Sequence, residues 1–438
     1  MLRSAASKGI DMTVSLVLRQ VRLIDPGQGW DRVGDVWLDQ GRIRQVGFPL
    51  PDLETEVPEI MAPGWVVAPG LVDLYGQPGE PGFEQRETLA SLSAAALAGG
   101  FTRVGVLPTT DPVLDQVAGL EFWQKPRSFA MPRWGLWAAY SLGAKGSQLS
   151  HVMELAAAPV VGFGEGRPLP DLALLRRLGE FCQLWQKPLL VWPRWSALAQ
   201  GGVVYEGEWA LRLGLPGIPA LTETGAVALL LEWVRHTPAP IHLMRISQAR
   251  SVELLATAPD LPVTASTSWM HLIRCDQDIE RYQYDAALRL DPPLGSDQDR
   301  QALRRAVASG SLMISTDHTP FTFEEKMVGF EAAPPGAIGL ELALPLLWQE
   351  LVVPGILTPL QLWSALSFRP ATVLGDTPPG FAPGSLAELV VFAPDQPWIV
   401  DRLHSLSRNT LWWGETIQGR VVATLRDGLL VSGSLAHT

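Results

Sequence analysis

The sequence predicts a (β/α)₈ barrel of the TIM type with a small composite β-sandwich domain formed by the N- and C-terminal segments. Strand and helix patterns alternate through the middle of the chain, whereas strand patterns alone occupy both ends. At 438 residues the chain is long enough for one barrel and one small companion domain. The expected division is a disordered tail at 1–12, the β-domain at 13–65 and 377–438, and the barrel at 66–376.

The two ends of the chain carry similar strand patterns. Residues 14–48 alternate apolar and polar positions, and glycines separate the apolar stretches. This period of two is typical of short antiparallel strands joined by turns. Residues 388–392, 419–424 and 429–431 repeat the pattern near the other end. Both ends are therefore expected to contribute to one β-domain.

The middle of the chain supplies the barrel. Strands are expected at 69–74, 101–107, 188–192, 240–246, 261–265 and 311–316. Helices are expected at 87–98, 172–186, 223–235, 249–257, 297–309 and within 340–376. Asp171 is a candidate N-cap, and Gly99 and Gly100 end the first of these helices. Repeated βα units without a Gly-rich phosphate fingerprint favour a barrel over a doubly wound sheet.

Composition excludes several classes of partner. The net charge of −11 argues against nucleic acid and anionic membranes, which bind basic patches. Cys182 and Cys275 lack CxxC spacing and are expected to be small buried residues rather than a disulfide or a metal site. The first eleven residues lack the apolar core of a secretory signal, and Met12 is an alternative start. With no apolar run long enough for a bilayer, the expected location is the cytoplasm.

Five segments resemble the type I dihydroorotases of the amidohydrolase superfamily, over roughly residues 14–434. Residues 69–84 share the frame of the family's Asp-Leu-His-x-His-x-Arg-Glu-Pro-Gly motif, and residues 315–320 read Ser-Thr-Asp-His-Thr-Pro, similar to Ala-Thr-Asp-His-Ala-Pro. The other segments are 201–219, 339–345 and 408–410. The resemblance implies the barrel fold and a zinc-dependent opening or closing of the cyclic amide dihydroorotate.

The metal ligands that the resemblance implies are mostly replaced. The family's four histidine positions hold Tyr75, Gln77, Trp192 and Arg245. Its bridging carboxylate falls near Glu165, one residue out of place, and only Asp317, a ligand and general base in the family, is kept. The seven histidines (His151, His236, His242, His271, His318, His404 and His437) form no HxH or HExxH pair. We expect no metal; zinc is the alternative if the chain is an active enzyme.

The substrate contacts that the resemblance implies are altered as well. An arginine, two asparagines, a second arginine and a histidine of the family correspond here to Gly79, Thr109, Asp291, Gly295 and Phe321. Asp291 is therefore an acid where the family has an amide, and Gly79 and Gly295 provide no cation for a substrate carboxylate.

Asp317 has two interpretations. It is either a catalytic base or a buried carboxylate that needs a cationic partner. We favour the second and expect Arg245 to replace the metal's charge, with Asp317, Asp291 or Glu165 around it. His318 and His242 are expected to project away from the barrel mouth as structural side chains, because neighbours on a strand alternate faces.

Trp192, Trp195 and Trp269 fall in or beside the same segments. They either form a new pocket for a planar ligand or fill space left by metal and water, and close packing favours the second.

The leading functional hypothesis is an inactive dihydroorotase-like protein kept as a structural or regulatory partner in pyrimidine biosynthesis. The family analogy suggests an aspartate transcarbamoylase catalytic chain as that partner. One alternative is an active dihydroorotase or cyclic amidohydrolase that uses Asp317 with Tyr75, Gln77 or Glu165. A third is a small-molecule sensor, and a homo-oligomer is compatible with each.

Overall fold

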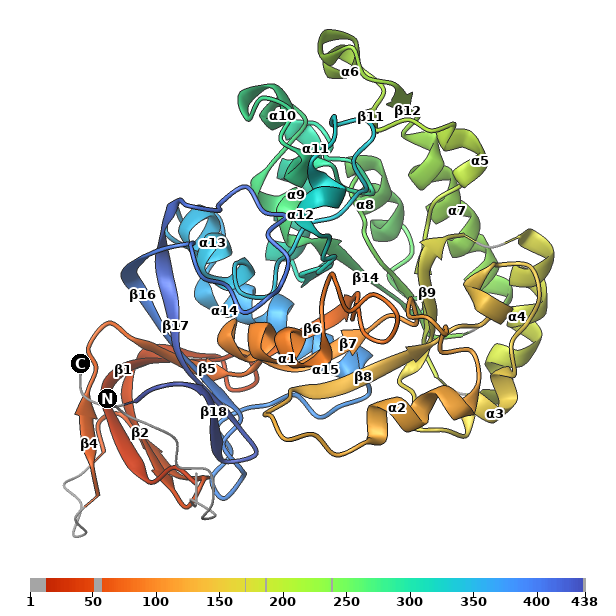
Figure 1. Cartoon of the computed structure of the whole chain (residues 1–438). Helices are drawn as coiled ribbons and strands as arrows, with labels where there is room; N and C mark the ends of the chain where they lie inside the picture. Colours follow the sequence, from red (N-terminus) through yellow and green to blue (C-terminus); the bar gives the residue numbers. More distant parts are fainter. Residues whose placement is uncertain (1–12, 51–56, 170, 186, 238, 436–438) are drawn as a thin grey trace.

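The computed structural model describes residues 13–50, 57–169, 171–185, 187–237 and 239–435. Its centre is a parallel sheet of eight strands in the order β15-β14-β13-β10-β9-β8-β7-β6, surrounded by helices (Figure 1). The strands are β6 Leu71–Gly76, β7 Phe101–Val106, β8 Arg133–Ala138, β9 Gly162–Pro168, β10 Leu189–Trp192, β13 Ile241–Leu243, β14 Val263–Ser268 and β15 Met313–Ser315. The predicted TIM-type fold is confirmed.

A buried carboxylate joins the first and last strands of this sheet. Asp73 in β6 accepts hydrogen bonds from the Ser315 hydroxyl at 2.7 Å and from the Thr316 amide at 2.8 Å. The Gln77 amide donates to the His318 carbonyl at 2.8 Å. These contacts close the barrel, because they hold the end of β15 against β6.

The described helices follow in chain order, the longer ones outside the barrel and several short ones in its loops (Figure 1). They are α1 Leu89–Ala98, α2 Leu120–Gln124, α3 Val152–Ala156, α4 Leu172–Trp185, α5 Ser196–Ala199, α6 Glu208–Leu213, α7 Leu221–His236, α8 Ala249–Ala256, α9 Trp269–Ile273, α10 Gln277–Arg281, α11 Asp297–Ala308, α12 Phe323–Lys326, α13 Ala343–Leu347, α14 Pro359–Trp363 and α15 Arg369–Val373. Single π-helical turns at Trp348–Val352 and Ser364–Phe368 extend α13 and join α14 to α15. No helix among the described residues is long and apolar enough to cross a membrane.

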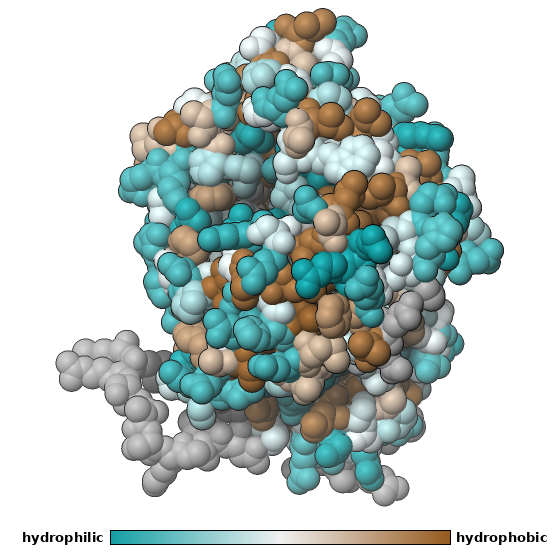
Figure 2. Space-filling view, turned by 90° about the vertical axis from the view of Figure 1, so that its right-hand side faces the viewer, coloured by the Kyte–Doolittle hydropathy of each residue, from teal (hydrophilic) through white to brown (hydrophobic). Residues whose placement is uncertain are grey.

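Helix α4 illustrates how the sequence directs this packing. Leu174, Leu175, Leu178 and Cys182 recur at helical spacing and are buried against the barrel. Asp171 accepts from the Ala173 amide at 2.7 Å, which confirms the predicted cap. Figure 2 shows the side of the molecule that carries α4, where hydrophilic side chains cover most of the face and hydrophobic ones gather in patches. Both cysteines are buried and free, as expected.

The second sheet combines both ends of the described chain (Figure 1). Its strands follow the order β18-β17-β16-β5-β1-β2-β3, with β4 beside β1. They are β1 Leu16–Asp25, β2 Trp30–Asp39, β3 Arg42–Gly47, β4 Glu59–Met61, β5 Val66–Pro69, β16 Leu389–Ile399, β17 Thr416–Arg426 and β18 Leu429–Gly433. A bridge from Thr13 to Leu429 brings the far edge back to the start of β1.

This sheet therefore curls around a core of its own. Leu18, Leu38, Val67 and Leu389 belong to that core, while neighbours such as Phe392 pack on the barrel side. The composite domain is confirmed as part of the fold class. Its predicted boundaries stay predictions, and the predicted tail at 1–12 lies outside the described residues. A further pair, β11 Val204–Tyr205 and β12 Gly217–Ile218, flanks α6.

Candidate functional site

The barrel mouth is organised around one buried ion pair. The Arg245 guanidinium donates from Nε to Asp317 Oδ2 at 2.8 Å and from Nη2 to Oδ1 at 2.7 Å. The two side chains are 5% and 14% exposed. Burial raises the pKa of Asp317, and the charge of Arg245 opposes that shift. The predicted pairing of Arg245 with Asp317 is confirmed.

Both residues stand just past the C-terminal ends of strands, where barrel enzymes place their functional groups. Arg245 follows β13 and Asp317 follows β15 by two positions. Their φ angles are 59° and 48°, in the left-handed region that non-glycine residues rarely occupy. Such strain is concentrated at functional sites, where the surroundings hold the backbone in place. The bidentate pair and its neighbours supply that restraint here.

The remaining Arg245 contacts come from other strands. Nη1 donates to the Gly166 carbonyl at 3.2 Å, and the guanidinium carbon lies 4.6 Å from the centre of the Trp192 ring. Arg194 lies 5.2 Å from the same ring. Trp192 thus supports two guanidinium groups and does not contribute a metal-binding atom.

Beneath the pair, polar side chains form what we call the inner network: Asp73, Tyr75, His242, Ser266 and Ser315. The Tyr75 hydroxyl accepts from the Arg245 amide at 3.1 Å and lies 3.0 Å from Ser266 Oγ. The His242 ring bonds Ser266 through Nε2 and Thr264 through Nδ1, both at 2.8 Å. Ser315 Oγ donates to Asp73 and also lies 3.2 Å from the Tyr75 carbonyl.

The placement of His242 corrects one expectation. Its nitrogens are satisfied, as predicted, but its ring lies in the barrel interior and connects to Arg245 through Ser266 and Tyr75. The alternation argument was wrong because β13 ends at Leu243 and the left-handed Arg245 turns its side chain back over the interior. Burial lowers the pKa of His242 to about 3 and raises that of Tyr75. His318 does point away, towards Glu87 and the Gly339 amide.

Glu165 and Asp291 have partners other than Arg245. Glu165 accepts from the Ser141 amide at 2.7 Å and hydroxyl at 2.6 Å, and burial raises its pKa to about 7. Asp291 forms an ion pair with Arg194. Of the three carboxylates expected around Arg245, Asp317 is therefore the one that pairs with it.

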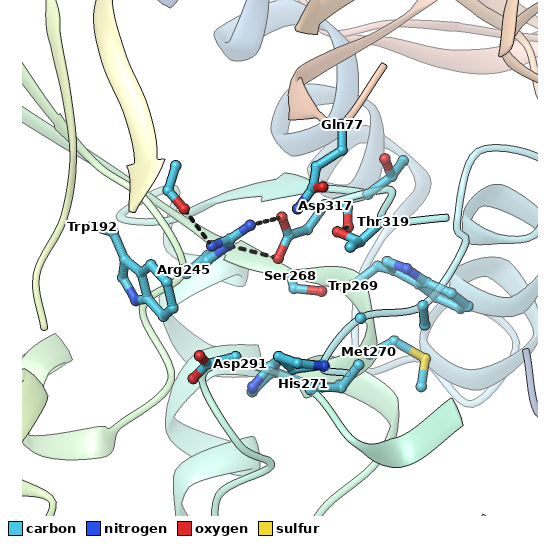
Figure 3. Close-up of a pocket in the computed structure, with 16 residues that line it drawn as sticks. Gln77, Trp192, Arg245, Ser268, Trp269, Met270, His271, Asp291, Asp317 and Thr319 are labelled. Atoms are coloured by element: carbon cyan, nitrogen blue, oxygen red, sulfur yellow. Dashed lines mark hydrogen bonds and ion pairs between the residues drawn. The ribbon is translucent and has the colours of Figure 1, made fainter. Parts of the chain in front are cut away.

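Above the ion pair lies a cavity of about 140 Å³ (Figure 3). Its lining residues come from the ends of several barrel strands and from the loops that follow them: Gln77, Gly166, Trp192, Arg245, Ser268, Trp269, Met270, His271, Leu290, Asp291, Thr316, Asp317, Thr319, Pro335, Gly336 and Ala337. Trp192 and Trp269 stand on opposite sides of the ion pair in this view. Trp195 is not part of the lining.

Of the five positions aligned with substrate contacts, only Asp291 lines this cavity. Gly79 has a φ of 74°, and a Cβ there would lie 2.4 Å from the Glu87 carbonyl oxygen. Gly295 abuts Asp299, Thr109 Oγ1 is buried without a partner among the described residues, and Phe321 packs between Arg86 and Lys326. None of these four residues lines the cavity.

Sequence reasoning missed His271 and Ser268. Ser268 ends β14, and helix α9 begins at the next residue, which turns His271 towards the mouth. His271 Nε2 contacts the Pro292 and Pro293 carbonyls at 3.2 and 3.1 Å. Burial lowers its pKa to about 4. A serine at a strand end directly before a helical stretch was the available signal.

The residues at the mouth do not fit a catalytic zinc ion. Within the described ranges, no three His, Cys, Asp or Glu side chains converge closely enough to hold a metal. Zinc sites use several imidazole, thiolate or carboxylate ligands. Of the two carboxylates that line the cavity, Asp317 has both oxygens engaged by Arg245, and Asp291 is paired with Arg194.

Comparisons with known proteins identify the family. No family model matches the chain. A Synechocystis protein named "Probable dihydroorotase-like protein" is 39% identical over 92% of this chain and 98% of its own length. A "Dihydroorotase" of Pelobacter propionicus is 34% identical over 95% and 99%. An L-hydantoinase structure from Arthrobacter aurescens superposes with a TM-score of 0.83 at 20% identity, covering 96% of each chain, which shows the shared fold. The chain belongs to the dihydroorotase family of amidohydrolases.

Proposed function

We propose that this chain is a dihydroorotase-like protein without metal-dependent hydrolysis, and that it works as a structural or regulatory partner in pyrimidine biosynthesis. The observation that carries the proposal is the bidentate Arg245–Asp317 pair at the barrel mouth. A buried guanidinium keeps its proton and offers no lone pair to a metal. It also repels a cation placed beside it.

The other implied ligand positions support the same proposal. Tyr75 holds a buried hydroxyl whose pKa is raised, so the phenolate form is disfavoured. Gln77 and Trp192 offer an amide and an indole in place of imidazoles. The atoms that would bind zinc in the family are therefore missing from these positions. Arg245 supplies a positive charge in place of the metal.

Metal content and activity test this proposal. The chain is produced in zinc-supplemented medium, and its zinc content and its cyclisation of carbamoyl aspartate are measured on one sample. The Pelobacter propionicus relative serves as the positive control. We expect zinc far below one ion per chain and no turnover. About one zinc per chain together with turnover would overturn the proposal.

A protein partner is the second part of the proposal. By family analogy we propose the catalytic chain of the cognate aspartate transcarbamoylase. Size-exclusion chromatography of the two proteins, alone and mixed, tests this. We expect the mixture to elute earlier than either protein; separate elution with unchanged volumes contradicts the partnership and leaves the metal result standing.

An active dihydroorotase or cyclic amidohydrolase is the second candidate. The names of the relatives favour it more directly than they favour an inactive protein, since relatives called dihydroorotase match nearly the whole chain. Asp317 with Tyr75 or Gln77 would have to carry the chemistry, because Glu165 is engaged by Ser141. Turnover that is lost in Asp317→Asn would establish this candidate.

A further inference from the structure

A second cavity, which we call the junction cavity, lies where the composite sheet meets the barrel, beside the contact of α13 with β17 (Figure 1). The barrel contributes the end of α1, α13 and the residue Glu341 before it, and the composite sheet contributes β16, β17, β18 and the loop after β16. None of its lining residues lines the cavity at the barrel mouth. Its volume of about 520 Å³ is within the range of about 300–1,000 Å³ for small-molecule sites, which often lie between domains.

Two guanidinium groups of the junction cavity are unpaired. Arg402 follows β16 and Arg420 lies in β17, and both line the cavity. Neither side chain forms an ion pair or a hydrogen bond with another described residue. A guanidinium presents parallel N–H donors that match the oxygens of a phosphate or a carboxylate. Two of them at one cavity therefore favour an oxyanion as the ligand.

The carboxylates of the lining leave part of this positive charge uncompensated. Glu341 accepts from the His404 amide at 2.8 Å and from the Ser405 amide at 3.1 Å, and so holds the loop that follows Arg402. Burial raises the pKa of Glu341 to about 7, so much of this carboxyl is uncharged near neutral pH. Asp401 is the other carboxylate of the lining, and it is exposed. One exposed carboxylate does not neutralise two guanidinium groups.

Apolar side chains complete the lining. Trp398 is half-buried, and its indole N–H donates to the Gly419 carbonyl at 2.8 Å, which fixes the ring at the cavity wall. Pro345, Pro397 and Val421 also line the cavity. A fixed indole in the same cavity as two guanidinium groups suits a ligand that combines an aromatic ring with an oxyanion.

From these groups we infer that the junction cavity binds a small aromatic oxyanion, which is a ring that bears a phosphate or a carboxylate group. The site shares no lining residue with the barrel mouth, so it is independent of whether the mouth holds a metal. The ligand is bound and does not react.

Isothermal titration calorimetry with the full chain tests the inference, with phenyl phosphate, benzoate, benzyl alcohol and inorganic phosphate as probes. We expect phenyl phosphate or benzoate to bind, and the tighter of the two identifies the oxyanion. Benzyl alcohol lacks the charge and inorganic phosphate lacks the ring, so each should bind at least about tenfold more weakly than that probe.

The variants Arg402→Ala and Arg420→Ala should each weaken binding of the tighter probe about tenfold, because a hydrogen bond to a charged group is lost. Both residues are exposed, so the variants should fold like wild type. Arg305→Ala is the matched control. This arginine of α11 is also exposed and has no ion pair within the described ranges, but it lies outside the cavity, and its loss should leave binding unchanged.

Three outcomes overturn the inference: no binding of either aromatic oxyanion by the wild-type chain, equal binding by wild type, Arg402→Ala and Arg420→Ala, or an equal loss in Arg305→Ala. Inorganic phosphate that binds as tightly as phenyl phosphate would contradict the aromatic class. These results are separate from the zinc and turnover assays. A metal-free, inactive chain that binds neither aromatic oxyanion refutes the inference alone, and a zinc-loaded active chain refutes the proposed function alone.

Discussion

The inner network and the cavity lie on opposite sides of the same ion pair, but their polar groups differ in how far they are hydrogen-bonded within the protein. Below the pair, Tyr75, His242 and Ser266 form a continuous chain of hydrogen bonds. Above it, the side chains of Gln77 and Ser268 form no hydrogen bond with another described residue, and His271 Nδ1 is buried without one in the described chain. A fully satisfied network stabilises and fixes a core, whereas unmet capacity beside a cavity costs stability unless a ligand or water fills it.

The difference indicates that the lower layer stabilises the fold, whereas the side chains of the upper layer add few hydrogen bonds to it. Arg245 belongs to both, since its backbone amide joins the inner network and its guanidinium forms the floor of the cavity.

The largest effect is expected from removing one member of the ion pair. Asp317→Ala leaves the Arg245 charge buried and unpaired, which should lower the free energy of unfolding by about 3–5 kcal/mol in urea denaturation. Glu253→Gln breaks an exposed pair whose side chains are both 63% exposed, and should change it by less than about 0.5 kcal/mol. The double variant Asp317→Leu with Arg245→Met should recover much of the loss, because no buried charge remains. An Asp317→Ala protein as stable as wild type would show that the pair does not hold the two layers together.

The next largest effect is a pH dependence of the free energy of unfolding, which arises from His242 in the inner network. Its folded pKa of about 3 lies below the ordinary value of 6.5, so the unfolded chain takes up a proton that the folded chain excludes. Stability is therefore lost as pH falls below about 6.5, by about 2 kcal/mol from this residue between pH 7 and pH 5. Urea titrations at both pH values should show a smaller loss in His242→Gln.

The exposed His151 provides the matched control, and His151→Gln should keep the wild-type pH dependence. His271, with a pKa of about 4, contributes loss of the same sign, so some dependence should remain in His242→Gln. An unchanged slope in that variant would place His242 outside the buried network.

A smaller effect is expected for the tyrosine hydroxyl that links His242 to Arg245. Tyr75→Phe leaves the Arg245 amide and Ser266 without one partner, which should lower the free energy of unfolding by about 1–2 kcal/mol. Tyr282→Phe removes a hydroxyl that bonds no described residue and should stay within about 0.5 kcal/mol of wild type. Equal effects of the two variants would argue against a structural role for the inner network.

The fold class and the central ion pair could be predicted from the sequence. The layers above and below the pair could be predicted only in part. Alternating strands and helices indicated the barrel, but β8 and β9 were missed because Gly135, Gly162, Gly164 and Gly166 interrupt their apolar patterns. Arg245 and Asp317 were paired from their places at strand ends. The location of His242 depended on a left-handed residue, and that of His271 on a helix beginning directly after β14, neither of which follows from periodicity.

The smallest change in stability is expected from two serines of one strand, and it compares the two layers most closely. Ser266 Oγ bonds both Tyr75 and His242, whereas Ser268, two positions later on β14, faces the cavity without a partner in the described chain. Ser266→Ala should cost about 1–2 kcal/mol, and Ser268→Ala should change stability by less than about 0.5 kcal/mol. Both values come from urea denaturation. If only Ser266→Ala is destabilised, the hydrogen bonds below the ion pair carry the stability; if Ser268→Ala is as destabilised as Ser266→Ala, the cavity wall is part of the structural core.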